Sequence, residues 1–335
     1  MDSGETLVEA ALEVLETPDP VEKARLGEKV AIRWLDGTIK LPYHYHHNHH
    51  NDLPPDRPAR LCNVKLLPPQ KMPKLGKGGS LQSRQAILHS LVHIESWAID
   101  LSWDIIARFG RQESMPREFF TDFVKVAEDE GRHFSLLVAR LEELGSFYGA
   151  FPAHDGLWDS AIETSNNLLA RLAVEHCVHE ARGLDVLPTT ISRFRDGGDE
   201  KTAKLLETVV YPEEITHCAA GIRWFNYLCL RTSRIYGCAD LVLTSVKPQI
   251  SSTVEIISDG LTEDRSVESG EESLRSSVIA GDDQHEIVIR TFHATVKRYF
   301  HGPLKPPFNA EARKAAGFGP AWYEPLAVKE VKICK

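Results

Sequence analysis

Two Glu-x-x-His motifs, each set within a helical pattern of apolar residues, constrain this chain most. The motifs are Glu130-Gly131-Arg132-His133 and Glu214-Ile215-Thr216-His217. Around the first motif, apolar residues recur every three or four positions, and this spacing continues straight through the Glu and the His. The second motif lies in a similar pattern. Residues i and i+3 of a helix share a face, so each motif places a carboxylate and an imidazole side by side toward the core.

Two further segments carry one carboxylate each at the centre of an apolar face. Glu95 interrupts one stripe of apolar residues, and Glu180 interrupts another. The pattern predicts four long helices, over about 80–109, 116–144, 159–187 and 199–236. We therefore expect an all-α fold, built on a four-helix bundle in which every helix turns one Glu inward.

Buried carboxylates that lie together need compensation by positive charge. Burial disfavours their ionised form, and like charges raise one another's pKa. Two metal cations would resolve this conflict, and oxygen ligands together with imidazoles suit iron or manganese. A Glu from each of two helices, with Glu-x-x-His from the other two, is the ligand set of ferritin-like di-metal proteins. We predict two iron ions, with manganese as the alternative, held by six residues: Glu95, Glu130, His133, Glu180, Glu214 and His217.

Several neighbouring residues leave alternatives open. Asp100 competes with Glu95 as the ligand from the first helix, although the stripe around Glu95 is more apolar. Arg132 and Arg182 could orient the ligands or form salt bridges between helices. His176 shares the inward stripe, as an extra ligand or as a core histidine. We interpret Cys177 and Cys218 as packing residues.

The remainder of the chain divides by composition. Residues 1–79 are expected to form two short helices, over 4–17 and 20–35, followed by an extended arm rich in Pro and His. The bundle is assigned to 80–240. Residues 251–286 hold ten acidic and two basic residues and are expected to be a disordered insertion. Residues 287–335 should form a helix and a tail that packs on the bundle. Five His within His44–His50 suggest a flexible loop that binds metal only loosely.

Charge and hydropathy exclude several classes of partner. The net charge of −9 disfavours nucleic acid and anionic membranes. No apolar run is long enough to cross a bilayer, and the acidic start lacks the features of a signal or transit peptide. The six Cys form no Cys-x-x-Cys pair. We therefore expect a cytoplasmic protein.

Four segments resemble a ferritin-like family of unknown function found in bacteria and eukaryotes. They are LVHIESWAIDLSWDIIARF (91–109), VAEDEGRHFSLLVARLEELGSFYGAFPAHDGLW (126–158), HEARGLDVLP (179–188) and YPEEITHCAAGIRWF (211–225). The flanking segments PPDRPARL (54–61) and HGPLKPPFNAEARKAAGFGPAWYEPLA (301–327) are similar as well. The resemblance implies a di-iron four-helix bundle, distantly similar to rubrerythrins and di-iron tRNA hydroxylases, and supplies no reaction. Asp100 stands where the family's first helix is expected to carry Glu.

The leading functional hypothesis is an oxygen-dependent di-iron oxidoreductase of the hydroxylase or oxidase type. Its substrate, small or macromolecular, is unidentified, and an oxygenase would need an external electron donor. Glu130 and Glu214 would bridge the metals. The alternatives are iron oxidation or peroxide scavenging, as in ferritin or rubrerythrin, and a non-catalytic scaffold stabilised by metal. Without metal, we expect replacement of Glu130 by Ala to relieve repulsion and raise stability.

Overall fold

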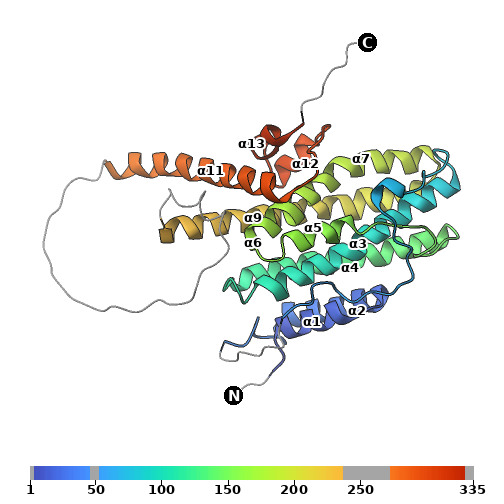
Figure 1. Cartoon of the computed structure of the whole chain (residues 1–335), viewed down its shortest axis with the longest axis horizontal. Helices are drawn as coiled ribbons and strands as arrows, with labels where there is room; N and C mark the ends of the chain where they lie inside the picture. Colours follow the sequence, from blue (N-terminus) through green and yellow to red (C-terminus); the bar gives the residue numbers. More distant parts are fainter. Residues whose placement is uncertain (1–3, 46–52, 237–271, 329–335) are drawn as a thin grey trace, which may run out of the picture.

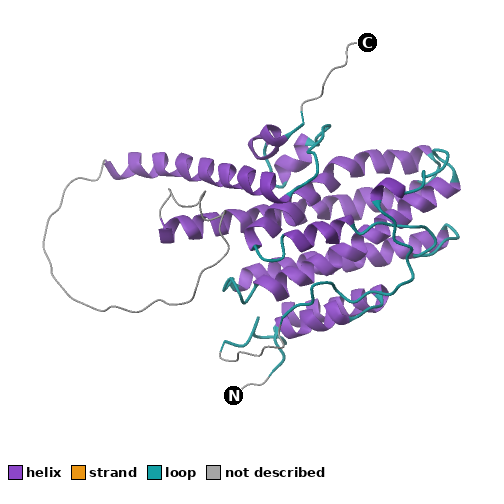
Figure 2. Ribbon diagram, in the orientation of Figure 1, coloured by secondary structure: helices purple, strands orange, loops and turns teal. Residues whose placement is uncertain are grey.

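A computed structural model of the chain describes residues 4–45, 53–236 and 272–328. Over these ranges the regular secondary structure is helical, apart from isolated β-bridges, as Figure 2 shows. The prediction of an all-α fold is thus confirmed for these residues. None of the helices within these ranges has the length and apolar character that crossing a membrane requires.

Four long helical runs lie side by side (Figure 1). Helix α3 spans Leu81–Phe109 and α4 spans Arg117–Glu143, each within one residue of its predicted bounds. Helix α6 (Leu168–Ala173) leads into α7 (Glu180–Asp196), and α8 (Glu200–Leu205) leads into α9 (Tyr211–Tyr236). Helix α3 packs against α4, α4 against α9, α9 against α7, and α6 against α3. The four runs therefore enclose a common interior.

A helical hairpin covers one side of this assembly. Helix α1 (Leu7–Glu16) begins with a capping box in which Thr6 and Glu9 satisfy each other's backbone N–H groups. Asp19 caps α2 (Pro20–Leu35). Helix α1 packs on α3, and α2 packs on α4. From residue 53 to 80 the chain forms turns and irregular segments, with one short 3₁₀ turn and a β-bridge at Leu66. Most of the His-rich loop, residues 46–50, lies outside the described residues.

The third long run differs from the prediction of one helix over 159–187. Helix α5 (Gly156–Glu163) ends early, and Asn167 caps a new helix, because its side chain accepts a hydrogen bond from a backbone N–H of α6. The run then continues through Pro188, beyond the predicted end at residue 187. Proline cannot donate to the carbonyl of Leu184. The side-chain amide of Asn309 donates to that carbonyl instead, at 3.1 Å.

The C-terminal segment also contains a correction. Helix α11 spans Glu272–Tyr299, so the prediction of disorder over 251–286 is wrong from residue 272 onward. Residues 272–280 contain Leu, Arg and Ala, which favour helix, and no Gly or Pro. Residues 251–271 lie outside the described residues.

After α11 the chain turns back onto the helical body, as predicted for the tail. Helices α12 (Ala310–Ala315) and α13 (Pro320–Tyr323) are followed by a 3₁₀ turn over Glu324–Leu326. Trp322 is buried against Phe225 and Phe292. The tail is therefore part of the core.

Candidate metal centre

The six predicted side chains converge in the interior enclosed by α3, α4, α7 and α9. Their candidate ligand atoms form two groups of four, and within each group all four atoms lie within 4.8 Å of one another. Glu130 and Glu214 belong to both groups. The first group adds Glu95 and His133, and the second adds Glu180 and His217. Each group therefore has one carboxylate and one imidazole of its own, in addition to two shared carboxylates.

Two π-helical segments precede carboxylates of this cluster. One spans Val174–His179 and ends directly before Glu180. The other spans Leu206–Val210 and ends four positions before Glu214. A π-helical turn contains more residues than an α-helical turn, so it changes the direction of the side chains that follow it. Such segments occur often at functional sites, and here both adjoin the same cluster.

Glu130 lies between the two histidines. Its carboxylate is 3.0 Å from Nδ1 of His217 and 3.5 Å from Nδ1 of His133. Burial alone would raise the pKa of Glu130, but the two imidazoles outweigh it and hold that pKa well below its ordinary value. Burial likewise opposes the charge of His133, yet Glu130 and Glu95 raise its pKa to about 11. The pKa of His217 is also raised, mainly by Glu130 against the effect of burial.

The pKa values of the other three carboxyl groups of the cluster are raised, in contrast to that of Glu130. Burial, together with the charge of Glu130, raises the pKa of Glu95 to about 8 and that of Glu214 to about 7. Burial and the neighbouring Glu214 raise the pKa of Glu180 well above its ordinary value. Without metal at neutral pH, the raised pKa values therefore favour protonated histidines and protons on Glu95 and Glu180, whereas Glu130 stays ionised and Glu214 lies near the midpoint of its titration.

Two further carboxylates hold the histidines from outside the cluster. Nε2 of His133, on α4, donates to Glu213 on α9 at 2.6 Å. In the reverse sense, Nε2 of His217, on α9, lies 3.3 Å from Asp129 on α4. Arg132 forms ion pairs with both of these carboxylates, because its guanidinium is 2.7 Å from Asp129 and 2.6 Å from Glu213. Each histidine thus has Nε2 engaged, which leaves Nδ1 facing the cluster.

Sequence reasoning missed Asp129 and Glu213. A signal was present, since an acidic residue directly precedes the Glu of both motifs. The predicted role of Arg132 in orienting ligands agrees with its contacts to these two carboxylates. Arg182 instead donates to the backbone carbonyl of Lys305, away from the cluster.

The alternatives to the six residues lie elsewhere. Asp100 is fully buried on another face of α3, where it pairs with Lys23 at 2.5 Å and Arg60 at 2.7 Å. His176 belongs to neither group of four and packs against the edge of Phe123. The thiols of Cys177 and Cys218 are buried, and burial raises the pKa of both. They are packing residues, as expected.

The cluster fits a pair of metal ions on two grounds. Nδ1 of His133, Nδ1 of His217 and Oε2 of Glu130 are buried without a hydrogen-bond partner. Buried polar atoms are ordinarily hydrogen-bonded, so unbonded atoms that face one another indicate a place for a cation. In addition, carboxylate oxygens combined with imidazole nitrogens suit iron and manganese. Their role as metal ligands stays a prediction.

Comparison with known proteins identifies the family. The family described as "Protein of unknown function (DUF455)" matches residues 16–252, more than half of the chain. The chain belongs to the DUF455 family. An uncharacterised protein of Haemophilus influenzae is 34% identical over 221 residues, which cover 64% of this chain and 74% of that protein. No solved structure gives a significant match. The predicted membership of a family of unknown function is confirmed, and all six cluster residues fall within the range that matches DUF455.

Proposed function

We propose that this DUF455 protein is a ferritin-like di-metal carboxylate protein that carries out an oxygen-dependent oxidation of the hydroxylase or oxidase type. It would hold two iron ions, with manganese as the alternative. The observation that carries the proposal is the sharing of Glu130 and Glu214 by two adjacent groups of ligand atoms. A pair of cations, rather than a single one, matches two groups with a common pair of carboxylates.

The grouping assigns a role to each side chain. Glu130 and Glu214 would bridge the ions. Glu95 and His133 would complete one site, and Glu180 and His217 would complete the other.

The chemistry divides between the metal and the chain. Bound iron supplies electron transfer and the capacity to react with oxygen. The chain's residues bind and orient: Asp129 and Glu213 engage Nε2 of each histidine, so that Nδ1 is presented to a cation. Metal binding would displace the protons held by His133 and Glu95, because ligands must be deprotonated.

Metal content tests the proposal. Metal-free protein is titrated with Fe(II) without oxygen, and bound iron is counted after desalting. We expect two ions for the wild type, about one for His133→Ala, and less than one for Glu130→Ala, since Glu130 would serve both sites. Glu128→Gln, which changes a neighbouring carboxylate on α4, should leave two. Equal iron content in all four proteins would contradict the proposal.

Exposure of the iron-loaded protein to oxygen then tests the activity. An oxidase or hydroxylase should consume oxygen when a reductant is supplied, and this consumption should be lost in Glu130→Ala. Bound iron that consumes no oxygen would favour the scaffold hypothesis. Accumulation of many irons per chain would favour storage.

A further inference from the structure

A cavity of about 460 Å³ lies at the end of the bundle where α3 begins and α7 ends (Figure 1). Three segments form it: residues 75–79, the first two turns of α3, and the last turn of α7 together with Gly197. Its volume falls in the range of small-molecule sites. Leu75, Ile87 and Phe194 contribute an apolar wall, which suits the organic part of a small molecule.

Arg84 lines this cavity and has unused hydrogen-bond donors. Its side chain is only 20% exposed, yet the guanidinium donates no hydrogen bond to any residue that the structure describes. Asp199 lies 3.5 Å from it, but the oxygens of Asp199 accept hydrogen bonds from Arg140 and Thr202 instead. Buried polar groups are ordinarily hydrogen-bonded, so the guanidinium of Arg84 is available to a ligand.

Two glycines hold the aliphatic part of Arg84 in place. Gly79, with a φ of +75°, packs against Gly197 at the end of α7. A Cβ added at Gly197 would lie 3.2 Å from Cδ of Arg84 and 3.3 Å from Cα of Gly79. In addition, the backbone N–H groups of Gly78 and Gly79 donate to no acceptor within the described residues, and both glycines line the cavity. Backbone N–H groups in turns of this kind are common donors to anions.

The charges near Arg84 leave it as the excess cation. Arg140 is hydrogen-bonded to Asp199 at 2.8 Å, and Lys201 is hydrogen-bonded to Glu143 at 2.6 Å. These four side chains balance one another, two positive against two negative. The positive charge of Arg84 is therefore the third of three cations that share two carboxylates.

Two exposed side chains of α7, Arg193 and Asp196, also line the cavity. They are equal in number, but no ion pair joins them, and Arg193 forms no ion pair with any other described residue. Because Arg193 is exposed and unengaged, it can turn toward an anion bound at Arg84. Asp196 should oppose the same anion by its charge.

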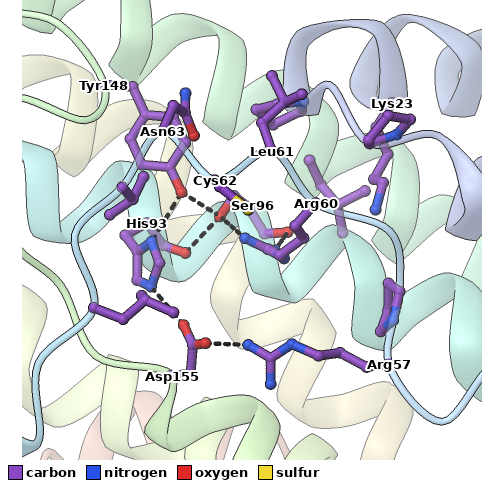
Figure 3. A pocket seen from close by; sticks show the side chains of 16 residues that line it. Lys23, Arg57, Arg60, Leu61, Cys62, Asn63, His93, Ser96, Tyr148 and Asp155 are labelled. Atoms are coloured by element: carbon purple, nitrogen blue, oxygen red, sulfur yellow. Dashed lines mark hydrogen bonds and ion pairs between the residues drawn. The ribbon is translucent and has the colours of Figure 1, made fainter.

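The charged groups of another cavity, of about 490 Å³, are by contrast already paired (Figure 3). Arg57 pairs with Asp155, and Arg60 is hydrogen-bonded to Asp100 at 2.7 Å. Each of these guanidinium groups has a carboxylate of the chain as its partner. The guanidinium of Arg84 has no carboxylate hydrogen-bonded to it, so the cavity at Arg84 is the better place for an external anion.

We propose that the cavity at Arg84 binds the phosphate group of a small phosphate monoester. The phosphate would accept hydrogen bonds from Arg84, from Arg193 and from the N–H groups of the two glycines of the 75–79 segment, and the organic part would lie against the apolar wall. A phosphate monoester offers three acceptor oxygens, which suits a guanidinium together with several other donors. None of the residues that line this cavity belongs to the metal cluster, so the proposal is independent of the proposed function.

The probes are butyl, hexyl, phenyl and benzyl phosphate, compared with inorganic phosphate and with benzoate. Calorimetry on the metal-free full chain measures their affinity, so that phosphate bound to iron does not contribute. At least one ester should bind one per chain and about tenfold more tightly than benzoate. Inorganic phosphate should also bind about tenfold more weakly than that ester, because it leaves the apolar wall uncovered. The proposal is overturned if no ester binds, or if inorganic phosphate or benzoate binds as tightly as the best ester.

Three variants locate the binding. Arg84→Gln should weaken ester binding about tenfold, the effect of one charge-assisted hydrogen bond. Asp196→Asn should strengthen it about threefold, because an exposed like charge is removed. Arg25→Gln, which removes an exposed arginine of α2 that pairs with Glu22, should bind like the wild type. Unchanged affinity in a folded Arg84→Gln protein, checked by its thermal melt, overturns the proposal. Weaker binding by Asp196→Asn, whose side chain is exposed and not needed for folding, overturns it as well.

Discussion

Glu130 holds both histidines of the cluster by charge. Burial of four carboxylates suggested that they repel one another, and that removal of Glu130 would stabilise the metal-free protein. The structure favours the opposite expectation, because the carboxylate lies within 3.5 Å of a nitrogen on each of two histidines whose pKa values are raised. In the metal-free protein, burial and then the charge of neighbouring carboxylates instead raise the pKa values of Glu95, Glu180 and Glu214.

Glu130→Ala should therefore destabilise the metal-free protein. Removing one partner from a buried ion pair leaves an uncompensated charge and typically costs about 3–5 kcal/mol. Urea denaturation in the presence of a chelator measures the change in the free energy of unfolding. A metal-free variant as stable as the wild type would show that Glu130 does not hold the histidines.

The pH dependence of metal-free stability follows from the raised pKa values. The folded protein keeps the Glu95 proton up to about pH 8 and the Glu214 proton up to about pH 7, whereas the unfolded chain loses both near pH 4.5. At these two residues the folded state binds more protons, so their contribution to stability should fall as pH rises from about 4.5 to 8. The contribution of His133 is fully present below pH 6.5 and is lost as pH rises toward 11.

Glu95→Gln isolates one part of this dependence. Gln resembles the protonated acid and does not ionise, so the variant should gain stability over the wild type progressively between pH 4.5 and 8. Chelator-treated samples at a series of pH values, unfolded by urea, give the comparison. A difference that is independent of pH would contradict the raised pKa of Glu95.

Asp129 and Glu213 should control metal affinity without being ligands. Loss of a partner that orients a ligand commonly lowers affinity about 10–100-fold. We expect this loss in Asp129→Asn and in Glu213→Gln, measured by competition with a chelator for Mn²⁺. Glu128→Gln, on the same helix as Asp129, should retain the affinity of the wild type. If both Asp129→Asn and Glu213→Gln keep the metal affinity of the wild type, these two residues do not orient the metal ligands.

At the scale of elements, a close approach of α9 to the π-helical segment Val174–His179 positions two parts of the cluster. A Cβ added at Gly221 would lie 1.9 Å from the backbone carbonyl oxygen of His176. Since backbone cannot move aside as a side chain can, Gly at this position sets the distance between the two elements. Helix α9 carries Glu214 and His217, and the π-helical segment leads into Glu180.

Gly221→Ala should therefore lower stability although Ala favours helix. Overpacking costs about 1–3 kcal/mol, which exceeds the gain of about 1 kcal/mol from replacing Gly in a helix. Gly131→Ala is the matched control, because a Cβ there would make ordinary contacts of 3.7 Å or more with Ala24. Thermal melts should show a lower midpoint for Gly221→Ala and an unchanged or higher one for Gly131→Ala.

At the scale of the whole molecule, the C-terminal segment completes the core. Arg313 of α12 forms a buried ion pair with Asp185 of α7 at 2.6 Å. Asn309 supplies the hydrogen bond that Pro188 cannot make. Trp322 fills the space between α9 and α11. The segment that contains these residues begins more than 100 positions after α7 in sequence.

Trp322→Ala and a deletion of residues 251–270 should differ in their effect on thermal stability. Truncating a buried Trp typically costs about 3–5 kcal/mol. Residues 251–270 are acidic and rich in Ser, and such a segment buries little apolar area. Differential scanning calorimetry should show a clearly lower Tm for Trp322→Ala and a nearly unchanged Tm for the deletion. A large fall in Tm on deletion would show that residues 251–270 pack against the body.

The sequence by itself determined which residues face the interior. A helix repeats every 3.6 residues, so the positions of Glu95, Glu130, Glu180 and Glu214 within apolar stripes predicted their convergence before any coordinates. The bounds of α3 and α4 followed from the same periodicity and from their flanking Ser, Pro and Gly. These are local properties, which a single segment carries on its own.

Only the tertiary structure decided what depends on contacts between segments. It placed Glu130 between two histidines, so that this carboxylate remains charged while its neighbours hold protons. It placed Asp129 of α4 beside His217 of α9, and Glu213 of α9 beside His133 of α4. It also allowed α7 to continue through Pro188, because the side-chain amide of Asn309 donates to the carbonyl of Leu184 that the proline leaves without a donor. Local periodicity sets a side chain's direction, but its partner, its pKa and the cavities around it come from residues far away in the chain.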